Sequence, residues 1–221
     1  MKAIRLSVIL CLFFLTLSVH AQSSKLDFGL KAGANYSKFT PNPQFYNIEL
    51  GKYKGKVGYY VGGFLNIEVS EKLQFQPELL IAMQGTRLLI EGIETQDPGN
   101  SPVVSDFRSK VNDLTIVLPL EVRYFFTQEF FAEAGPQIGY IVDRTYKTET
   151  EVLNDNFPNE REDPNNPNNF DYDKFEIGLN LGTGYNLSEK LTISARYFFG
   201  LNERDNNLKS SVINLGLEFK L

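Results

Sequence analysis

The sequence predicts an all-β protein, an eight-stranded antiparallel up-and-down transmembrane β-barrel, that follows a secretory signal peptide. Three observations predict this class. Apolar and polar residues alternate along eight segments of the chain. Charge is confined to one of the two faces that this alternation creates, and the connections between segments are alternately short and long. These features are typical of barrels that cross a bacterial outer membrane.

The first 21 residues have the three-part pattern of a secretory signal peptide. A short basic start is followed by the apolar run 6–17 and by Val19-His20-Ala21, which places small residues at the −3 and −1 positions of a cleavage site. The alternative is an uncleaved anchor helix, but the apolar run is shorter than the about 20 residues that a spanning helix needs. We therefore predict a cleaved signal peptide at residues 1–21, one barrel domain at residues 22–221 and an outer-membrane location.

Cleavage would change the chemistry that the chain can offer. Cys11 and His20, the only cysteine and histidine, would leave, and the chain has no tryptophan. Disulfides, Cys/His zinc sites and Cys–His or Ser–His catalytic pairs are then excluded. Loss of Lys2 and Arg5 leaves 20 basic and 27 acidic residues and moves the net charge from −5 to −7, the wrong sign for a nucleic-acid partner. We predict no cofactor, no metal site and no enzyme.

Eight segments alternate apolar residues with polar residues or glycine, and their lengths suit tilted strands of about 9–11 residues that cross hydrocarbon. The segments are 26–36, 57–69, 73–83, 114–124, 130–142, 175–187, 191–201 and 213–221. The short connections are 70–72, 126–129 and 188–190. The long ones are 37–56, 84–113, 143–174 and 202–212, and strands can extend into them. Short periplasmic turns and long outer loops predict the orientation of the barrel.

The two faces of these segments differ in charge, which predicts which face meets lipid. The apolar face has no charged residue, and tyrosines and phenylalanines gather at its ends, where amphipathic rings suit the membrane interface. The opposite face carries eleven charges: Asp27, Lys31, Glu68, Glu78, Glu121, Arg123, Glu133, Glu176, Arg196, Glu218 and Lys220. The alternative is a soluble lipocalin-like barrel turned the other way, but its outer surface would then be rich in glycine and poor in charge.

The inward face predicts a filled lumen, because eight strands enclose a space just wide enough for side chains. Glycines on this face make room for the large inward residues Tyr60, Phe64, Phe131 and Phe198. Six charged residues are expected at similar depth, counted from the short turns: Glu78, Glu121, Arg123, Glu133, Arg196 and Glu218. We interpret them as a lumen charge network that closes the barrel, in which Arg196 faces Glu78 or Glu218. The alternative is an acid–base site made of paired carboxylates.

Three prolines argue against the strand assignment, because proline removes a donor from the ladder. Pro77, Pro119 and Pro136 all lie inside predicted strands. A closed barrel has no free edge to hold them, so we expect bulges or local bends at these positions.

Several short motifs follow one another along the chain: Gly29–Asn35, Gln76-Pro77-Glu78-Leu79-Leu80, Leu118-Pro119-Leu120 before Arg123-Tyr124-Phe125, Glu133-Ala134-Gly135-Pro136 and Gly178–Tyr185. Taken in this order, they resemble the PorT-like outer-membrane β-barrel family of Bacteroidota. The resemblance covers about residues 25–221 and implies that the three prolines belong in the strands. It also implies a link to protein secretion, since the family's namesake is associated with the export of gingipain-type proteases, although the family is functionally mixed.

The acidic, Asn-rich segment 154–173 is expected to be a hydrated outer loop. The alternative is a calcium site, since clustered Asp and Asn oxygens suit that ion, but the spacing and glycine of an EF-hand are absent. The chain's role is then predicted from the barrel as a whole. We favour a structural or interaction protein of the envelope or of a secretion complex, with a narrow porin-like channel or small-ligand binder as the alternative.

The predicted location also implies partners. We expect contact with outer-membrane lipid and lipopolysaccharide. Phe219 and Leu221, at the end of the last strand, predict recognition by the outer-membrane barrel assembly machinery. A secretion or envelope protein is the third expected partner.

Overall fold

The computed structural model describes residues 26–46, 48–49, 51–95, 103–152, 173–203 and 208–221. The predicted signal peptide, and with it the boundary at residue 22, lies outside these ranges. So do residues 154–172, which contain nearly all of the segment considered for calcium. Within the described part, no helix is long and apolar enough to span a membrane.

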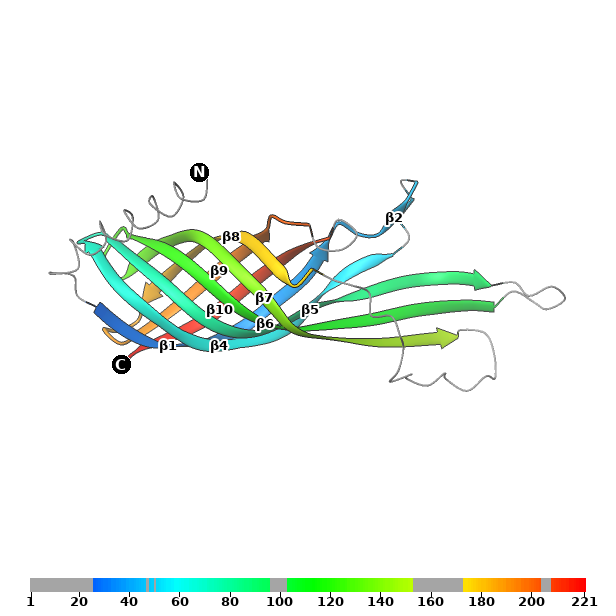
Figure 1. Cartoon of the computed structure of the whole chain (residues 1–221), viewed down its shortest axis with the longest axis horizontal. Coiled ribbons are helices and arrows are strands. Elements are labelled where there is room, and N and C mark those ends of the chain that lie inside the picture. The colour runs from blue at the N-terminus through cyan, green and yellow to red at the C-terminus, as the bar shows by residue number, and fades with distance from the viewer. Residues whose placement is uncertain (1–25, 47, 50, 96–102, 153–172, 204–207) are drawn as a thin grey trace, which may run out of the picture.

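Eight antiparallel strands form a closed ring, which confirms the predicted fold class (Figure 1). Each strand pairs with its neighbours in the chain, and β1 closes the ring against β10. The strands are β1 (Leu26–Thr40), β4 (Lys52–Ser70), β5 (Leu73–Thr95), β6 (Val103–Phe125), β7 (Phe130–Val152), β8 (Phe175–Asn186), β9 (Leu191–Gly200) and β10 (Lys209–Lys220). The two-residue strands β2 (Gln44–Phe45) and β3 (Ile48–Glu49) form a separate hairpin that the sequence pattern did not predict.

Three neighbouring strands are much longer than the apolar alternation predicts. β5, β6 and β7 each have 23 residues and continue past the barrel at the end opposite the short turns (Figure 1). Their outer parts pair with one another, as Arg87 with Lys110 and Lys110 with Lys147. The stretches 84–113 and 143–174 therefore contain a projecting three-stranded outer sheet as well as loops. Its apolar residues, such as Leu88, Leu89, Ile90 and Phe107, do not follow the apolar–polar alternation of the barrel strands, so the sequence pattern did not predict this sheet.

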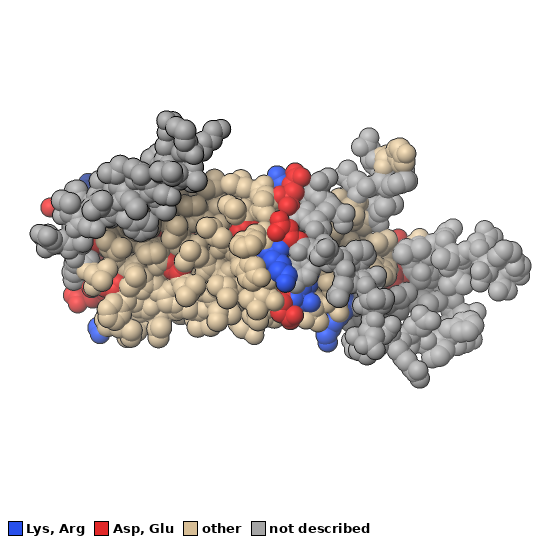
Figure 2. Space-filling model, viewed as in Figure 1, with Lys and Arg blue, Asp and Glu red and all other residues tan. Residues whose placement is uncertain are grey.

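The exposure pattern agrees with the predicted faces. Along β8, Leu179 and Leu181 are 49% and 60% exposed, whereas Asn180 between them is 3% exposed. Exposed apolar side chains cover the barrel, and a band of charged side chains lies where the outer sheet begins (Figure 2). Aromatic pairs lie towards both ends of this surface, with Tyr124 and Phe126 at 5.1 Å near the short turns and Tyr140 and Phe175 at 5.1 Å near the outer end. A chain with this surface places its apolar band in lipid and its aromatic rings at the interfaces.

Inward aromatic rings lie over glycines of neighbouring strands. A Cβ on Gly29 would come within 2.5 Å of the Phe64 ring, and one on Gly184 within 2.2 Å of the Phe131 ring. Tyr60 lies in the same way against Gly33 and Gly216, and Phe198 against Gly178. Glycine is therefore required at these positions by the close approach of the rings, as the sequence predicted.

The expectation of bulges at the strand prolines is wrong. The ladders keep one register past Pro77, Pro119 and Pro136, and the register shifts in β4–β7 occur elsewhere. Strand pairing is interrupted for two residues after Pro77 on the β6 side and after Pro119 on the β7 side. A closed barrel tolerates the missing donor because the hydrogen bonds on either side hold the register.

Candidate functional site: the charged lumen

The strand register places opposite charges side by side inside the barrel. Arg123 on β6 is the direct cross-strand neighbour of Glu133 on β7. Lys31 on β1 is the neighbour of Glu218 on β10, at the point where the ring closes. Directly opposed residues on one face lie about 4.5–5.5 Å apart at their Cβ atoms. The ladder alone therefore brings two oppositely charged pairs into contact.

Arg123 joins two carboxylates. Its Nε donates to Glu133 Oε2 at 2.9 Å. Its two terminal nitrogens donate to the two oxygens of Glu218, at 2.9 and 2.6 Å. The guanidinium also lies over the ring of Phe131, with 4.4 Å between Cζ and the ring centroid. Since the fork geometry fixes both partners, Arg123 holds β6, β7 and β10 in one arrangement across the lumen.

Arg196 on β9 makes a second fork at the same level. Its Nε donates to Glu133 Oε1 at 2.8 Å, and its terminal nitrogens donate to the two oxygens of Glu78 at 3.1 and 2.9 Å. Gly182 lies between Glu133 and Arg196 in the β7–β8–β9 register, and a side chain there would contact Glu133. Glu133 thus bridges the two arginines, and the absence of a Cβ at residue 182 leaves the space for this bridge.

Lys31 completes the group from the opposite wall. Its Nζ lies 2.9 Å from Glu78 Oε1 and 2.8 Å from Glu218 Oε1. Glu78 therefore connects Lys31 with Arg196, and Glu218 connects Lys31 with Arg123. Within the described part of the chain, Arg196 makes no ion pair with Glu218, so only one of its two expected partners is correct.

Glu121 is attached more loosely than the other carboxylates. Its Oε1 lies 3.5 Å from Arg196 and accepts a hydrogen bond from Asn180 at 2.6 Å. Its buried Oε2 has no hydrogen-bond partner among the described residues. The group as a whole contains four carboxylates and three cations, so it has one carboxylate more than it has cations. We call these seven residues the lumen network: Lys31, Glu78, Glu121, Arg123, Glu133, Arg196 and Glu218.

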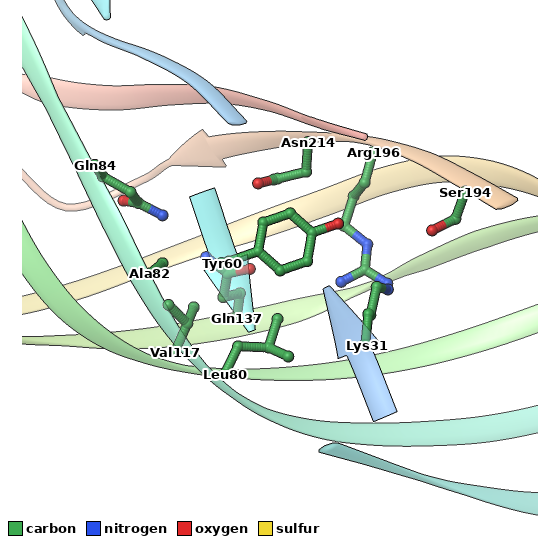
Figure 3. A pocket seen from close by; sticks show the side chains of 10 residues that line it. All are labelled: Lys31, Tyr60, Leu80, Ala82, Gln84, Val117, Gln137, Ser194, Arg196 and Asn214. Atoms are coloured by element: carbon green, nitrogen blue, oxygen red, sulfur yellow. The ribbon is translucent and has the colours of Figure 1, made fainter. Parts of the chain in front are cut away.

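A small cavity lies next to the lumen network. Its volume is about 20 Å³, which is room for about one water molecule. The ring of Tyr60 lies among the side chains around it, together with Lys31 and Arg196 (Figure 3). Tyr60 also packs in an apolar cluster with Leu80, Ala82 and Val117 on the side away from the charges.

A second ion pair lies above the lumen network, towards the outer end. Arg144 donates from Nε and a terminal nitrogen to the two oxygens of Asp113, at 2.6 and 2.7 Å. The guanidinium also lies 5.7 Å from the ring centroid of Phe39, which is buried. Ile141 and Val212 are almost fully buried as well. Sequence reasoning missed this layer, because Asp113 and Arg144 lie in stretches that were predicted as long connections and a bulge in β7 opposite Leu114 brings Arg144 to the inward face.

All six residues that the sequence assigned to the charge network lie together in the lumen. Lys31 was recognised as inward but was not placed with them, because its contact with Glu218 depends on the pairing of β1 with β10 where the ring closes. Asn180 and Gln76 were also missed as partners, although Gln76 donates to Glu78 Oε1 at 2.8 Å. Their inward position was the only available signal.

The closed ring, the apolar outer band and the charged interior define a class of small membrane-spanning β-barrels. The comparison with family models agrees, since residues 20–206 match the model described as "Outer membrane protein beta-barrel domain". The chain therefore belongs to this outer-membrane β-barrel family, and its place is the outer membrane. No curated protein sequence matches the chain.

Solved structures with a similar overall arrangement are distant in sequence. Ail, the attachment invasion locus protein of Yersinia pestis, was solved in complex with the heparin analogue sucrose octasulfate. It is 10% identical, with 89% of this chain and 99% of that chain covered and a TM-score of 0.43. OprG from Pseudomonas aeruginosa is 12% identical over 88% of this chain and 95% of that chain, with a TM-score of 0.42. Neisserial surface protein A is 13% identical over 88% and 97%, with a TM-score of 0.37.

Proposed function

We propose that this chain is a non-enzymatic structural or interaction protein of the outer membrane, with a closed lumen and an outer sheet that a partner binds. The observation that carries the proposal is the lumen network, in which side chains from six strands meet across the barrel. Large inward rings lie in the same space, and the cavity beside the network holds about one water molecule. An interior filled in this way leaves the surface outside the membrane as the place for function.

The projecting sheet formed by β5, β6 and β7 supports an interaction role. On the described part of the chain, no strand pairs with β7 beyond Tyr140, so its outer edge presents backbone groups to a partner. Exposed edges of this kind are templates for the addition of a strand from another protein. A partner from a secretion or envelope complex fits this surface and the resemblance to the PorT-like family.

Crosslinking in native outer membranes tests the interaction role. A photoreactive amino acid at Lys147, an exposed residue of the outer sheet, is expected to capture one defined protein. The same group at Glu189, in the short turn between β8 and β9, is the matched control and is expected to capture a different set or none. Identical products from the two positions would contradict a specific role for the outer sheet.

The second candidate is a narrow channel, and the observation in its favour is that the space beside the lumen network is large enough for about one water molecule. Planar-bilayer recording separates the two candidates. We expect no single-channel steps from the refolded wild-type barrel, and steps only when paired lumen residues are truncated. Stable conductance of the wild-type protein that changes in an Arg196→Gln variant, with unfolding unaltered, would replace the closed-lumen proposal by the channel.

Export and assembly complete the proposal. We propose that residues 1–21 are removed on export and that the barrel assembly machinery recognises the exposed residues Phe219, at the end of β10, and Leu221, just after it. Intact-mass measurement of protein purified from membranes tests the first point, with Gln22 expected as the first residue. Replacement of both Phe219 and Leu221 by serine is expected to reduce folded barrel in the membrane.

A further inference from the structure

A hollow of about 570 Å³ lies on the outside of the barrel, where β9, β10, β1, β4 and β5 reach the outer end. We call it the outer rim pocket. Six of its residues carry the argument: Tyr36, Tyr197 and Ile213 on one side, and Lys38, Lys54 and Arg87 on the other. Its size falls within the about 300–1,000 Å³ that small-molecule sites occupy. It shares no residue with the lumen network, and its residues Tyr36, Lys38 and Ile213 are exposed on the outward face of their strands.

The charges of the outer rim pocket are all of one sign. Its lining contains three cations and no carboxylate. Lys54 and Arg87 are direct cross-strand neighbours in the β4–β5 ladder, and both side chains are exposed. Like charges directly opposite each other destabilise a sheet. None of the three cations makes an ion pair within the described ranges, so an anion bound between them would remove a repulsion that the fold leaves in place.

The depth of the pocket is that of lipid headgroups. Tyr36, Ile213 and Tyr197 form one cross-strand row, and the tyrosines belong to the aromatic belt at the outer interface. Lys38, Ser211 and Phe199 form the next outward row on this face, about 7 Å further along the strands at about 3.3 Å per residue, which is about 5 Å further from the membrane centre at a tilt of about 40°. The hydroxyl groups of Tyr197 and Ser211 are hydrogen-bonded to each other. Apolar rings therefore lie at the acyl boundary, with cations directly above them.

We infer that the outer rim pocket binds the phosphorylated headgroup of an outer-leaflet glycolipid. Lys38, Lys54 and Arg87 hold the phosphate through charge-assisted hydrogen bonds, for which Lys and Arg are the suitable donors. Tyr36, Tyr197 and Ile213 contact the sugar and the first part of the acyl chains. The pocket thereby attaches one specific lipid to a fixed side of the barrel, which goes beyond the general solvation of its apolar band.

The test uses the full mature barrel in lipid nanodiscs. The barrel is then released from the nanodisc, and lipid that remains bound to it is detected by native mass spectrometry. The probes are bisphosphorylated lipid A and the same lipid after enzymatic removal of both phosphates. We expect wild-type barrel to retain the phosphorylated lipid and not the other. A Lys38→Gln, Lys54→Gln, Arg87→Gln triple variant is expected to lose on the order of tenfold or more in affinity, as three charge-assisted contacts disappear.

The matched control removes three exposed cations outside the pocket, as Arg108→Gln, Lys147→Gln and Lys174→Gln. It is expected to bind lipid A like the wild type, and an equal loss of binding would assign the effect to net charge and overturn the site.

Full retention of lipid A by the Lys38→Gln, Lys54→Gln, Arg87→Gln variant would also overturn the site. Complete displacement of the lipid by inorganic phosphate would show a site for free phosphate instead. If the triple variant fails to fold, the single variant Lys54→Gln tests the site instead. We expect it to unfold at a higher urea concentration than the wild type in phosphate-free lipid, and to bind lipid A more weakly.

Discussion

At the scale of single residues, the charged side chains of the lumen network cannot face lipid, so they pair with one another inside the barrel. Their ion pairs connect strands on different sides of the lumen. Each arginine makes a two-pronged contact with one carboxylate and a single contact with Glu133. Such buried groups are costly to desolvate, and their net effect on stability relative to an apolar interior is small. Loss of one partner is different, because it leaves an unpaired charge in a closed space.

Arg196→Leu is expected to destabilise the barrel by about 3–5 kcal/mol, because it leaves Glu78 with Lys31 alone and Glu133 with Arg123 alone as cationic partners. Glu78→Gln in the same chain should recover part of the loss. Glu218→Gln should recover less, because Glu218 makes no ion pair with Arg196 and is linked to Glu78 only through the shared Lys31. Urea midpoints of the refolded single and double variants measure the effect. Equal recovery by Glu78→Gln and Glu218→Gln would contradict the pairing described here.

Glu121 and Glu133 provide a second comparison within the same network. Glu121→Gln keeps an oxygen for Asn180 and removes the charge that exceeds the pairing, so we expect a change of less than about 1 kcal/mol in unfolding free energy. Glu133→Gln removes the carboxylate shared by both arginines and should cost about 3–5 kcal/mol. Both substitutions keep the side-chain shape, so denaturation curves compare charge alone. A larger loss for Glu121→Gln would show that the excess charge has a partner.

At the scale of elements, the packing of the strands depends on which residues lie on each face and on which inward glycines contact an aromatic ring. Alternation sets the faces, and the pairing register sets which glycine meets which aromatic residue. Gly184 on β8 receives Phe131 from β7, and these two residues are direct cross-strand neighbours. Large inward rings thus fit into an eight-stranded barrel without widening it.

Gly184→Ala is expected to cost about 1–3 kcal/mol, because its Cβ would overlap the Phe131 ring. Phe131→Leu in the same chain should return part of that loss, since the nearest atoms are those of the ring. Gly63→Ala is the control, because its Cβ would meet its nearest atom at an ordinary 3.5 Å. The fraction of heat-modifiable folded protein on gels reports assembly. Similar behaviour of Gly63→Ala and Gly184→Ala would argue against ring packing as the cause.

Leu181→Arg tests the lipid face of β8. The side chain is 60% exposed on the apolar band, so an arginine there should cost about 2–4 kcal/mol. Leu181→Phe is the control and should be nearly neutral, because it stays apolar. A substitution at neighbouring Asn180 is no suitable control, since that residue is buried and bonded to Glu121 and Gln137. Unfolding in lipid vesicles measures both variants, and equal stability would place Leu181 away from hydrocarbon.

At the scale of the whole molecule, short turns at one end and a projecting sheet at the other give the barrel a direction. Both described termini, near Leu26 and Leu221, lie at the end with the short turns (Figure 1). The outer sheet carries exposed charges such as Arg87, Arg108 and Lys147, so it stays outside the bilayer on the side of the long connections. This asymmetry distinguishes the end of the barrel with the short turns from the end with the outer sheet, which other molecules can reach.

Cysteine labelling on intact cells measures this direction, and the mature chain has no cysteine of its own if residues 1–21 are removed. We expect Lys147→Cys, on the outer sheet, to react with a membrane-impermeant maleimide. Glu189→Cys, in a short turn, should react only after permeabilisation. Both positions are exposed, so accessibility in the protein does not distinguish them. Labelling of Glu189→Cys in unbroken cells would reverse the orientation.

The sequence by itself determined the fold class, the strand number, the lipid face and the inward set of charges. Period-two alternation is a local property of each strand. Because charge in hydrocarbon is costly, every second residue of a membrane-spanning strand is uncharged, and this pattern is visible in the sequence. The six network residues were recognisable for the same reason, because their position on the inward face follows from their own strand. Phe131 and Gly184 likewise signalled a crowded interior before their contact was known.

Only the tertiary structure decided which of these residues meet. The pairing of Lys31 with Glu218 depends on the closure of the ring between β1 and β10, and the separation of Arg196 from Glu218 depends on depth across strands. The outer sheet was not predicted because its apolar residues do not alternate with polar ones along the strands. The Asp113–Arg144 pair was not predicted because a bulge in β7 opposite Leu114 brings Arg144 to the inward face. Register is a long-range property set by all eight strands together, so it is not contained in any one segment.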